Sequence, residues 1–207
     1  MSRFSVLLIT LCFFAAFNAI ALENFYQSGT EAFHEENGTL EALQASLLMG
    51  GFFLYGISFL VGGERLSSAL EVNWIIRGSA LLCLSFFVRE VDLETLSLPA
   101  LLVLPWVGTG RTITLCMLWG LFIYTMARSQ VNAKELMRAG VEQRVVACFA
   151  VAAALLCAGA LFDRGYIGGD SARFFEELLE TNAYLALMLP LYWLLSPWRQ
   201  SVAESVI

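Results

Sequence analysis

The sequence contains few charged residues, since only 14% of its 207 residues are Asp, Glu, Lys or Arg. An ordinary soluble domain has about 25%. Hydrophobic residues make up 58% of the chain, and the mean hydropathy is +0.71. A water-soluble fold of this size cannot hide that much apolar surface, whereas a lipid bilayer solvates it. The composition therefore predicts an integral membrane protein with a single transmembrane helical domain over residues 1–207.

Basic residues are scarce as well, and the formal net charge is −6. Nucleic-acid-binding domains carry a basic patch or stripe, which this sequence lacks. A polybasic segment that would bind anionic lipid headgroups is also missing. We therefore expect no nucleic-acid partner. The expected partner is the lipid bilayer, and a second membrane protein or a second copy of the chain remains open.

Histidine and cysteine motifs are lacking too. The only histidine, His34, precedes Glu35 and Glu36 in a polar loop, and these three residues are weak candidates for a metal site. The five cysteines lie within apolar runs and have neither metal-ligand nor CxxC spacing. The sequence therefore predicts no cofactor, and the single histidine argues against hydrolases that bind zinc through several histidines.

Long apolar segments are the main feature that is present. A membrane-spanning helix needs about 20 mostly apolar residues, and six segments qualify: 4–22, 40–62, 74–93, 108–127, 145–162 and 179–198. They predict an all-α, six-helix transmembrane bundle. With the N-terminus inside, eight of the 12 basic residues fall at inner positions, as the positive-inside rule requires. Both termini are therefore expected to be cytoplasmic.

The first segment has an alternative interpretation. Arg3 gives a basic start, and Ala19-Ile20-Ala21 has the pattern of a signal-peptide cleavage site. Cleavage there would leave five helices. The apolar run continues through Leu22, which favours a retained spanning helix. Both interpretations remain open at this stage.

Residues 98–106 are too apolar for a solvated loop and too few to cross a bilayer. Segments of this length are often interfacial or re-entrant. Two interpretations remain open: a segment in the outer headgroup layer, or a frayed N-terminal extension of the fourth helix.

Charged residues gather near the outer ends of the predicted helices. If Arg77 marks the inner end of the third helix, Val88 lies only about 16 Å further along, within a hydrocarbon layer of about 30 Å. In the sixth helix, Glu176 is one turn from Glu180 and shares its face. The same counting brings ten polar residues to one level: Glu41, Gln44, Arg89, Glu90, Asp92, Arg111, Asp163, Glu176, Glu177 and Glu180.

Charges at membrane depth are costly, so they usually face the bundle interior and pair with each other. We expect Arg89 or Arg111 to pair with one of three acids, namely Glu90, Asp92 or Glu180. Such a layer is a candidate functional site. The alternative is that these residues only mark helix ends, where water is available and charges are ordinary.

Three functions are compatible with this layer. The first is cation or proton binding in a transport or accessory role. The second is a structural or assembly subunit that uses residues 98–106 and 128–144 as contact surfaces. The third is a membrane-embedded enzyme that uses the carboxylates on a lipid or envelope substrate. Transporters often have broken helices at their sites, and here Pro190 is the only interior proline of a predicted helix.

The six-helix layout with acidic clusters at 87–92 and 175–180 resembles bacterial inner-membrane proteins. The resemblance implies a location in the bacterial inner membrane and assigns no activity. Whether the protein is an enzyme stays open on the sequence.

Overall fold

The computed structural model describes residues 3–28, 39–62, 70–91, 103–129, 143–169 and 171–194. This part of the chain is helical and contains no strand, which confirms the predicted all-α class. The helices are α1 (Arg3–Ser28), α2 (Thr39–Gly62), α3 (Leu70–Glu90), α5 (Gly108–Arg128), α7 (Gln143–Asp163) and α8 (Ala172–Leu194), with a short 3-10 turn, η4 (Leu104–Trp106).

Two predicted helix boundaries are wrong. Helix α1 continues to Ser28 rather than ending at Leu22, and α8 begins at Ala172 rather than at Leu179. Both extra stretches contain polar residues, which a count of apolar residues leaves out. Once a helix is nucleated, each further residue adds a backbone hydrogen bond, so polar turns extend these helices past their apolar parts.

Within the described ranges, four helices are long and apolar enough to cross a membrane: Leu40–Leu60, Val72–Glu90, Gly108–Arg128 and Val145–Asp163. These four helices support the integral membrane protein that the composition predicts. Helix α8 differs because its first nine residues include four charged ones, Arg173, Glu176, Glu177 and Glu180. The apolar segment predicted to span the membrane begins only at Leu179.

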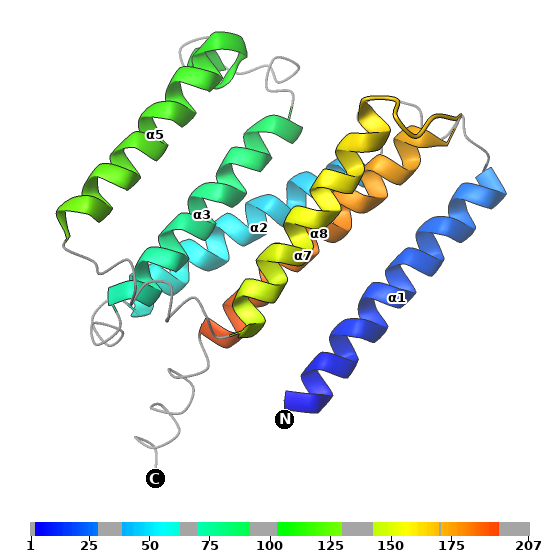
Figure 1. Ribbon diagram of the computed structural model, residues 1–207, viewed down its shortest axis with the longest axis horizontal. Coiled ribbons are helices and arrows are strands. Elements are labelled where there is room, and N and C mark those ends of the chain that lie inside the picture. The colour runs from blue at the N-terminus through cyan, green and yellow to red at the C-terminus, as the bar shows by residue number, and fades with distance from the viewer. Residues whose placement is uncertain are drawn as a thin grey trace.

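Helix α8 lies at the centre of the arrangement and contacts α7, α2, α3 and α1. Successive helices alternate in direction, so α1 starts and α8 finishes on the same side of the molecule, at the lower side in Figure 1. Helices α5 and α1 lie at opposite edges of the view, beyond α3 and α8 respectively (Figure 1). The packed part is therefore formed by α2, α3, α7 and α8.

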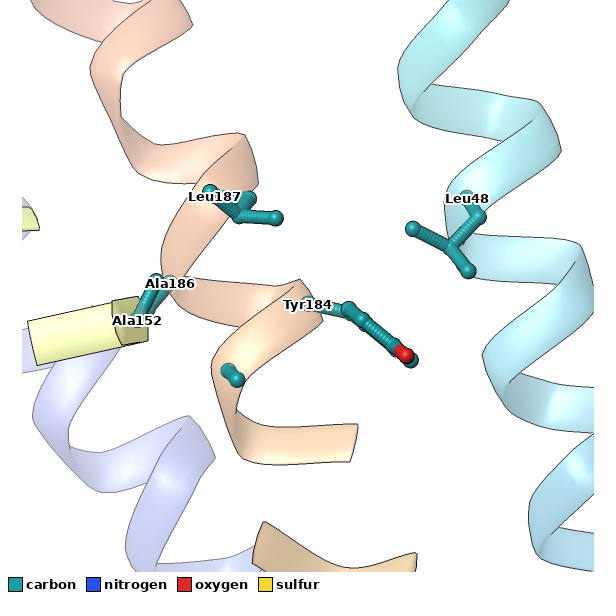
Figure 2. Packing of buried hydrophobic residues seen from close by; sticks show 6 residues of the cluster. Leu48, Ala152, Tyr184, Ala186 and Leu187 are labelled. Atoms are coloured by element: carbon teal, nitrogen blue, oxygen red, sulfur yellow. The ribbon is translucent and has the colours of Figure 1, made fainter. Parts of the chain in front are cut away.

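The core between these four helices combines close backbone approach with a few large side chains. Leu48 of α2 faces Tyr184 and Leu187 of α8, and Ala152 of α7 lies against Ala186 (Figure 2). Small residues at a helix contact allow the backbones to approach, which matters because lipid gives no hydrophobic drive for helix association. A buried hydrogen bond of 2.6 Å, from the Tyr55 hydroxyl to the Leu187 carbonyl, further joins α2 to α8.

Helix α1 contacts α8 through aromatic and amide side chains. The rings of Phe25 and Phe174 stack with their centroids 4.2 Å apart. Asn18 and Asn182 exchange reciprocal amide hydrogen bonds of 2.8 and 2.9 Å.

Helix α5 has no buried residue. Its contact with α3 includes a hydrogen bond of 3.0 Å from the Trp119 indole nitrogen to the Ser85 hydroxyl. The turn η4 precedes it and is followed by Val107, which has an extended backbone. The extended Val107 separates residues 104–106 from α5, and residues 98–102 of this segment lie outside the described ranges.

Candidate functional site

A polar cavity of about 650 Å³ lies at one end of the packed helices. We call it the acidic cavity. The starts of α2 and α8 meet the ends of α3 and α7 here, because neighbouring helices run in opposite directions. Its lining comprises Glu41, Gln44, Arg89, Glu90, Leu156, Ala160, Phe162, Asp163, Ala172, Arg173, Glu176, Glu177 and Glu180.

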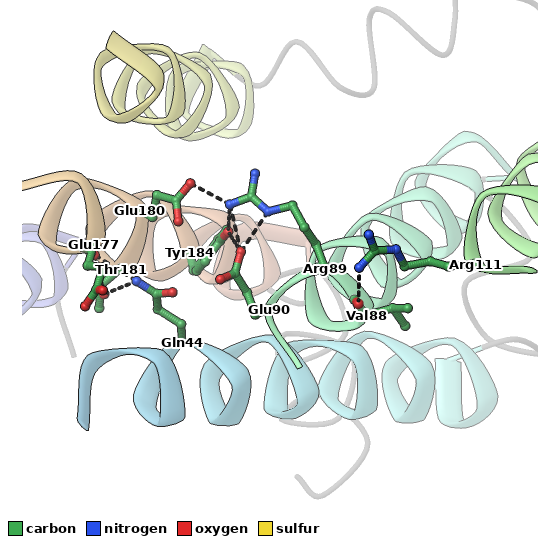
Figure 3. A network of polar contacts seen from close by, with 9 residues as sticks. All are labelled: Gln44, Val88, Arg89, Glu90, Arg111, Glu177, Glu180, Thr181 and Tyr184. Atoms are coloured by element: carbon green, nitrogen blue, oxygen red, sulfur yellow. Dashed lines mark hydrogen bonds and ion pairs between the residues drawn. The ribbon is translucent and has the colours of Figure 1, made fainter. Parts of the chain in front are cut away.

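The lining includes eight of the ten polar residues that the sequence placed at one level. The other two are Arg111 and Asp92. Arg111 does not line the cavity; its guanidinium donates to the Val88 carbonyl at 3.3 Å, near the end of α3 (Figure 3). Asp92 lies outside the described residues, as do the metal candidates His34, Glu35 and Glu36.

Gly159 of α7 lies beside α8 at this level, with room for ordinary contact by a small side chain. A Cβ atom added to Gly159 would lie 3.4 Å from Cγ of Glu180 and 3.6 Å from the carbonyl oxygen of Glu176. The close approach of the two helices brings Asp163, at the end of α7, to the same cavity as the acidic turns of α8.

Arg89 connects two carboxylates on different helices. It donates from Nε to Glu90 at 2.8 Å, and from Nη2 to Glu180 of α8 and to the Tyr184 hydroxyl at 3.0 Å (Figure 3). The Tyr184 hydroxyl in turn donates to Glu90 at 2.8 Å. The side chains of Glu90 and Glu180 are only 11% and 12% exposed. Arg89 therefore pairs with two largely buried carboxylates and offsets one of their two negative charges.

Arg173 holds a second pair of carboxylates. Its Nη2 lies 3.0 Å from Glu41 of α2, and its Nε lies 3.2 Å from Glu177, one turn further along α8. Together the two arginines bind four of the six carboxylates in the cavity lining.

Gln44 is fully buried beside these pairs. Its amide nitrogen donates to the Glu177 carbonyl at 2.9 Å and to the Thr181 hydroxyl at 3.1 Å, which fixes the orientation of the amide. Its Oε1 has no hydrogen-bond partner among the described residues, and in Figure 3 this oxygen points away from Thr181. A buried acceptor without a donor is costly and calls for an explanation.

Two carboxylates of the lining, Glu176 and Asp163, make no ion pair with any described residue. Glu176 lies before Leu179, outside the apolar part of α8. Burial, together with the neighbouring carboxylates of Asp163, Glu180 and Glu177, raises the pKa of Glu176 to about 7 against the opposing effect of Arg173. With every carboxylate ionised, the six carboxylates and two guanidinium groups of the lining give the cavity a formal excess of four negative charges.

Sequence reasoning missed three contributors: Arg173, Thr181 and Tyr184. Arg173 precedes Leu179, where the sixth helix is predicted to begin, so the count of apolar residues leaves it out. Its spacing of four residues from Glu177 is a signal for an ion pair on one helix. Nothing in the sequence distinguished Tyr184 from the other aromatic residues of the apolar segments.

The cavity is suited to bind positive charge and hydrogen-bond donors. Among the described residues, no group of three or more His, Cys, Asp and Glu side chains is placed to hold a metal ion. The chain matches no family model, and neither a curated protein nor a solved structure matches it.

Proposed function

We propose that the protein binds a cation or a proton in the acidic cavity, in a transport or accessory role. The observation that carries this proposal is the excess of carboxylates over guanidinium groups in a cavity shared by four helices. Charged residues within a membrane protein usually pair with each other and mark ion or proton pathways. Here the pairing is incomplete, since Glu176 and Asp163 are left without an arginine among the described residues.

The proposal includes six membrane spans, cytoplasmic termini and a location in the bacterial inner membrane. The acidic cavity lies at the end of the bundle opposite the start of α1. With the N-terminus inside, as the distribution of basic residues favours, the cavity faces the outer side. A ligand would then reach it from outside the cell membrane.

The two kinds of carboxylate have different roles in this proposal. Those paired with Arg89 and Arg173 fix the ends of α2, α3 and α8 relative to each other. Glu176 and Asp163 supply the negative charge that attracts the ligand. Proton binding at Glu176 and cation binding at the cavity compete, because a bound cation favours the ionised carboxylate.

The test is thermal unfolding of the full chain in nanodiscs between pH 5 and pH 8, with Na⁺, Mg²⁺, Ca²⁺ and putrescine as added cations. Wild type is compared with the double variant Glu176→Gln/Asp163→Asn. A ligand of the native state raises the unfolding temperature by mass action. We expect a pH- or cation-dependent shift in wild type that the double variant loses.

Glu23→Gln is the matched control, because Glu23 is an exposed acid near the end of α1 and does not line the cavity. It should keep the wild-type shift. If all three proteins respond alike, the carboxylates of the cavity are ordinary helix-end charges and the proposal is wrong.

A second candidate function, as a subunit of a membrane complex, is favoured by α5. This helix has no buried residue, and its Met117 and Leu121 are 70% and 60% exposed. Native mass spectrometry after extraction in a mild detergent would show a stoichiometric partner or a second copy under this candidate. A monomer alone would count against it.

A further inference from the structure

We infer that the ligand of the acidic cavity is a small organic cation that carries at least two ammonium groups. This inference rests on the proposed function and narrows it to a class of substrate. Three features of the acidic cavity support this class of ligand: its size, its unpaired acceptors and the apolar part of its lining.

Size argues against a bare metal ion. Cavities of about 300 to 1,000 Å³ hold small organic ligands, and this one measures about 650 Å³. A Ca²⁺ ion requires six to eight oxygen ligands within about 2.6 Å. The described acidic residues include no cluster of three that converges on such a point. The negative charge is instead spread over the ends of four helices.

The acceptors match ammonium groups. An ammonium group has three donors and no acceptor. Glu176 and Asp163 offer carboxylates without an ion pair, and the buried Oε1 of Gln44 lacks a donor. Gln44 belongs to α2, whereas the two acids belong to α8 and α7, so a ligand with separated ammonium groups reaches acceptors on different helices. A single monovalent cation would leave three of the four excess charges in place.

The rest of the lining suits the carbon chain of such a ligand. Leu156, Ala160 and Phe162 contribute apolar surface from α7. Methylene groups between the ammonium groups can lie on this surface while the charged ends meet the acids. Anionic and neutral ligands lack this match, since the cavity is negative in excess.

Binding should be coupled to proton release. Glu176 faces Asp163 from α7 and has Arg173, Glu177 and Glu180 near it on its own helix. Its pKa of about 7 leaves it partly protonated at neutral pH. A bound ammonium group favours the ionised form, so affinity should fall as the pH is lowered through 7.

Isothermal titration calorimetry of the full chain in nanodiscs, with spermidine as the probe, tests the inference. We expect saturable binding in wild type and loss of about tenfold or more in affinity in Glu176→Gln/Asp163→Asn, since hydrogen bonds to charged groups contribute at least that much. Gln44→Leu, which removes the buried acceptor, should also weaken binding. Glu23→Gln should bind as wild type does. Unliganded thermal unfolding confirms that each variant is folded.

The outcomes separate this inference from the proposed function. If Mg²⁺ or Ca²⁺ binds and spermidine neither binds nor competes, the organic-cation inference is overturned while cation binding stands. If only pH changes stability, proton binding stands and the organic ligand is again overturned. If spermidine binds with equal affinity to wild type and the folded double variant, the assignment to this cavity is wrong. If folded wild type responds to no cation and no pH change, both proposals fail.

Discussion

Helix α8 and helix α5 are both long, yet they have opposite environments. Helix α8 contacts α1, α2, α3 and α7, and its residues from Thr181 to Tyr184 are all buried. Helix α5 contacts α3 and η4, and none of its residues is buried. The polar groups follow the same division, since the acidic cavity involves α8 and not α5.

The difference shows what drives association of these helices. Lipid solvates apolar side chains as well as a neighbouring helix does, so packing depends on small residues and on polar contacts. Helix α8 has both: Ala183 and Ala186 in its core, and an arginine and three glutamates in its first turns. Helix α5 exposes large apolar residues such as Met117 and Leu121, and its side chains Trp119 and Arg111 each donate one hydrogen bond to α3.

The largest loss of stability should come from substitution of Arg89. Arg89→Leu leaves Glu90 and Glu180 without their guanidinium partner in a largely buried setting, so the free energy of unfolding should fall by about 3 kcal/mol. Arg128→Leu is the matched control, because Arg128 is exposed at the end of α5; it should change stability by less than about 0.5 kcal/mol. Equal losses in reversible unfolding would remove the contrast between the two regions.

The next largest loss of stability should come from substitution of a leucine in the core. Leu48 is 1% exposed and Leu121 of α5 is 60% exposed. Leu48→Ala should cost about 2 kcal/mol because it opens a cavity between α2 and α8, whereas Leu121→Ala should be close to neutral. Denaturant unfolding in one detergent measures both. A costly Leu121→Ala would show that α5 is covered in the native assembly, as the second candidate function requires.

The asparagine pair gives a smaller effect. Asn18→Leu removes a hydrogen-bond donor from the buried Asn182 and should cost about 1 kcal/mol. The double variant Asn18→Leu/Asn182→Leu should recover part of that loss, and a double-mutant cycle gives the coupling. Additive losses would mean that the amides do not interact. Cleavage after Ala21, which the sequence leaves open, would also remove Asn18.

The smallest expected effect is a pH-dependent change in the unfolding temperature. The pKa of Glu176 is raised from its ordinary value to about 7, so the folded state holds this proton more tightly than the unfolded state. The associated stability is complete below about pH 4.5 and is lost as the pH rises through 7. Glu176→Gln should therefore unfold about 2 °C higher than wild type at pH 8. At pH 4.5 the difference should vanish, and a less stable variant at pH 8 would contradict this account.

Apolar length along the chain predicts the all-α class and groups eight residues that line the acidic cavity, although it misplaces the end of α1 and the start of α8. It could not decide between Arg89 and Arg111. Each lies about one turn from the end of an apolar segment, and only the rotation of α3 and α5 about their axes separates them. Packing sets that rotation: α3 turns Arg89 toward α8, while Arg111 reaches the Val88 carbonyl. Arg173 was missed for a different reason, since an apolar count excludes the polar first turns of α8.

The most direct test of the account compares spermidine binding to three proteins in nanodiscs: wild type, Glu176→Gln/Asp163→Asn and Arg111→Gln. The sequence grouped all three substituted residues together, and the structure places only the two acids in the acidic cavity. We predict that the double variant loses about tenfold or more in affinity, while Arg111→Gln binds as wild type does. Equal affinities in all three proteins, or a loss confined to Arg111→Gln, would contradict the account.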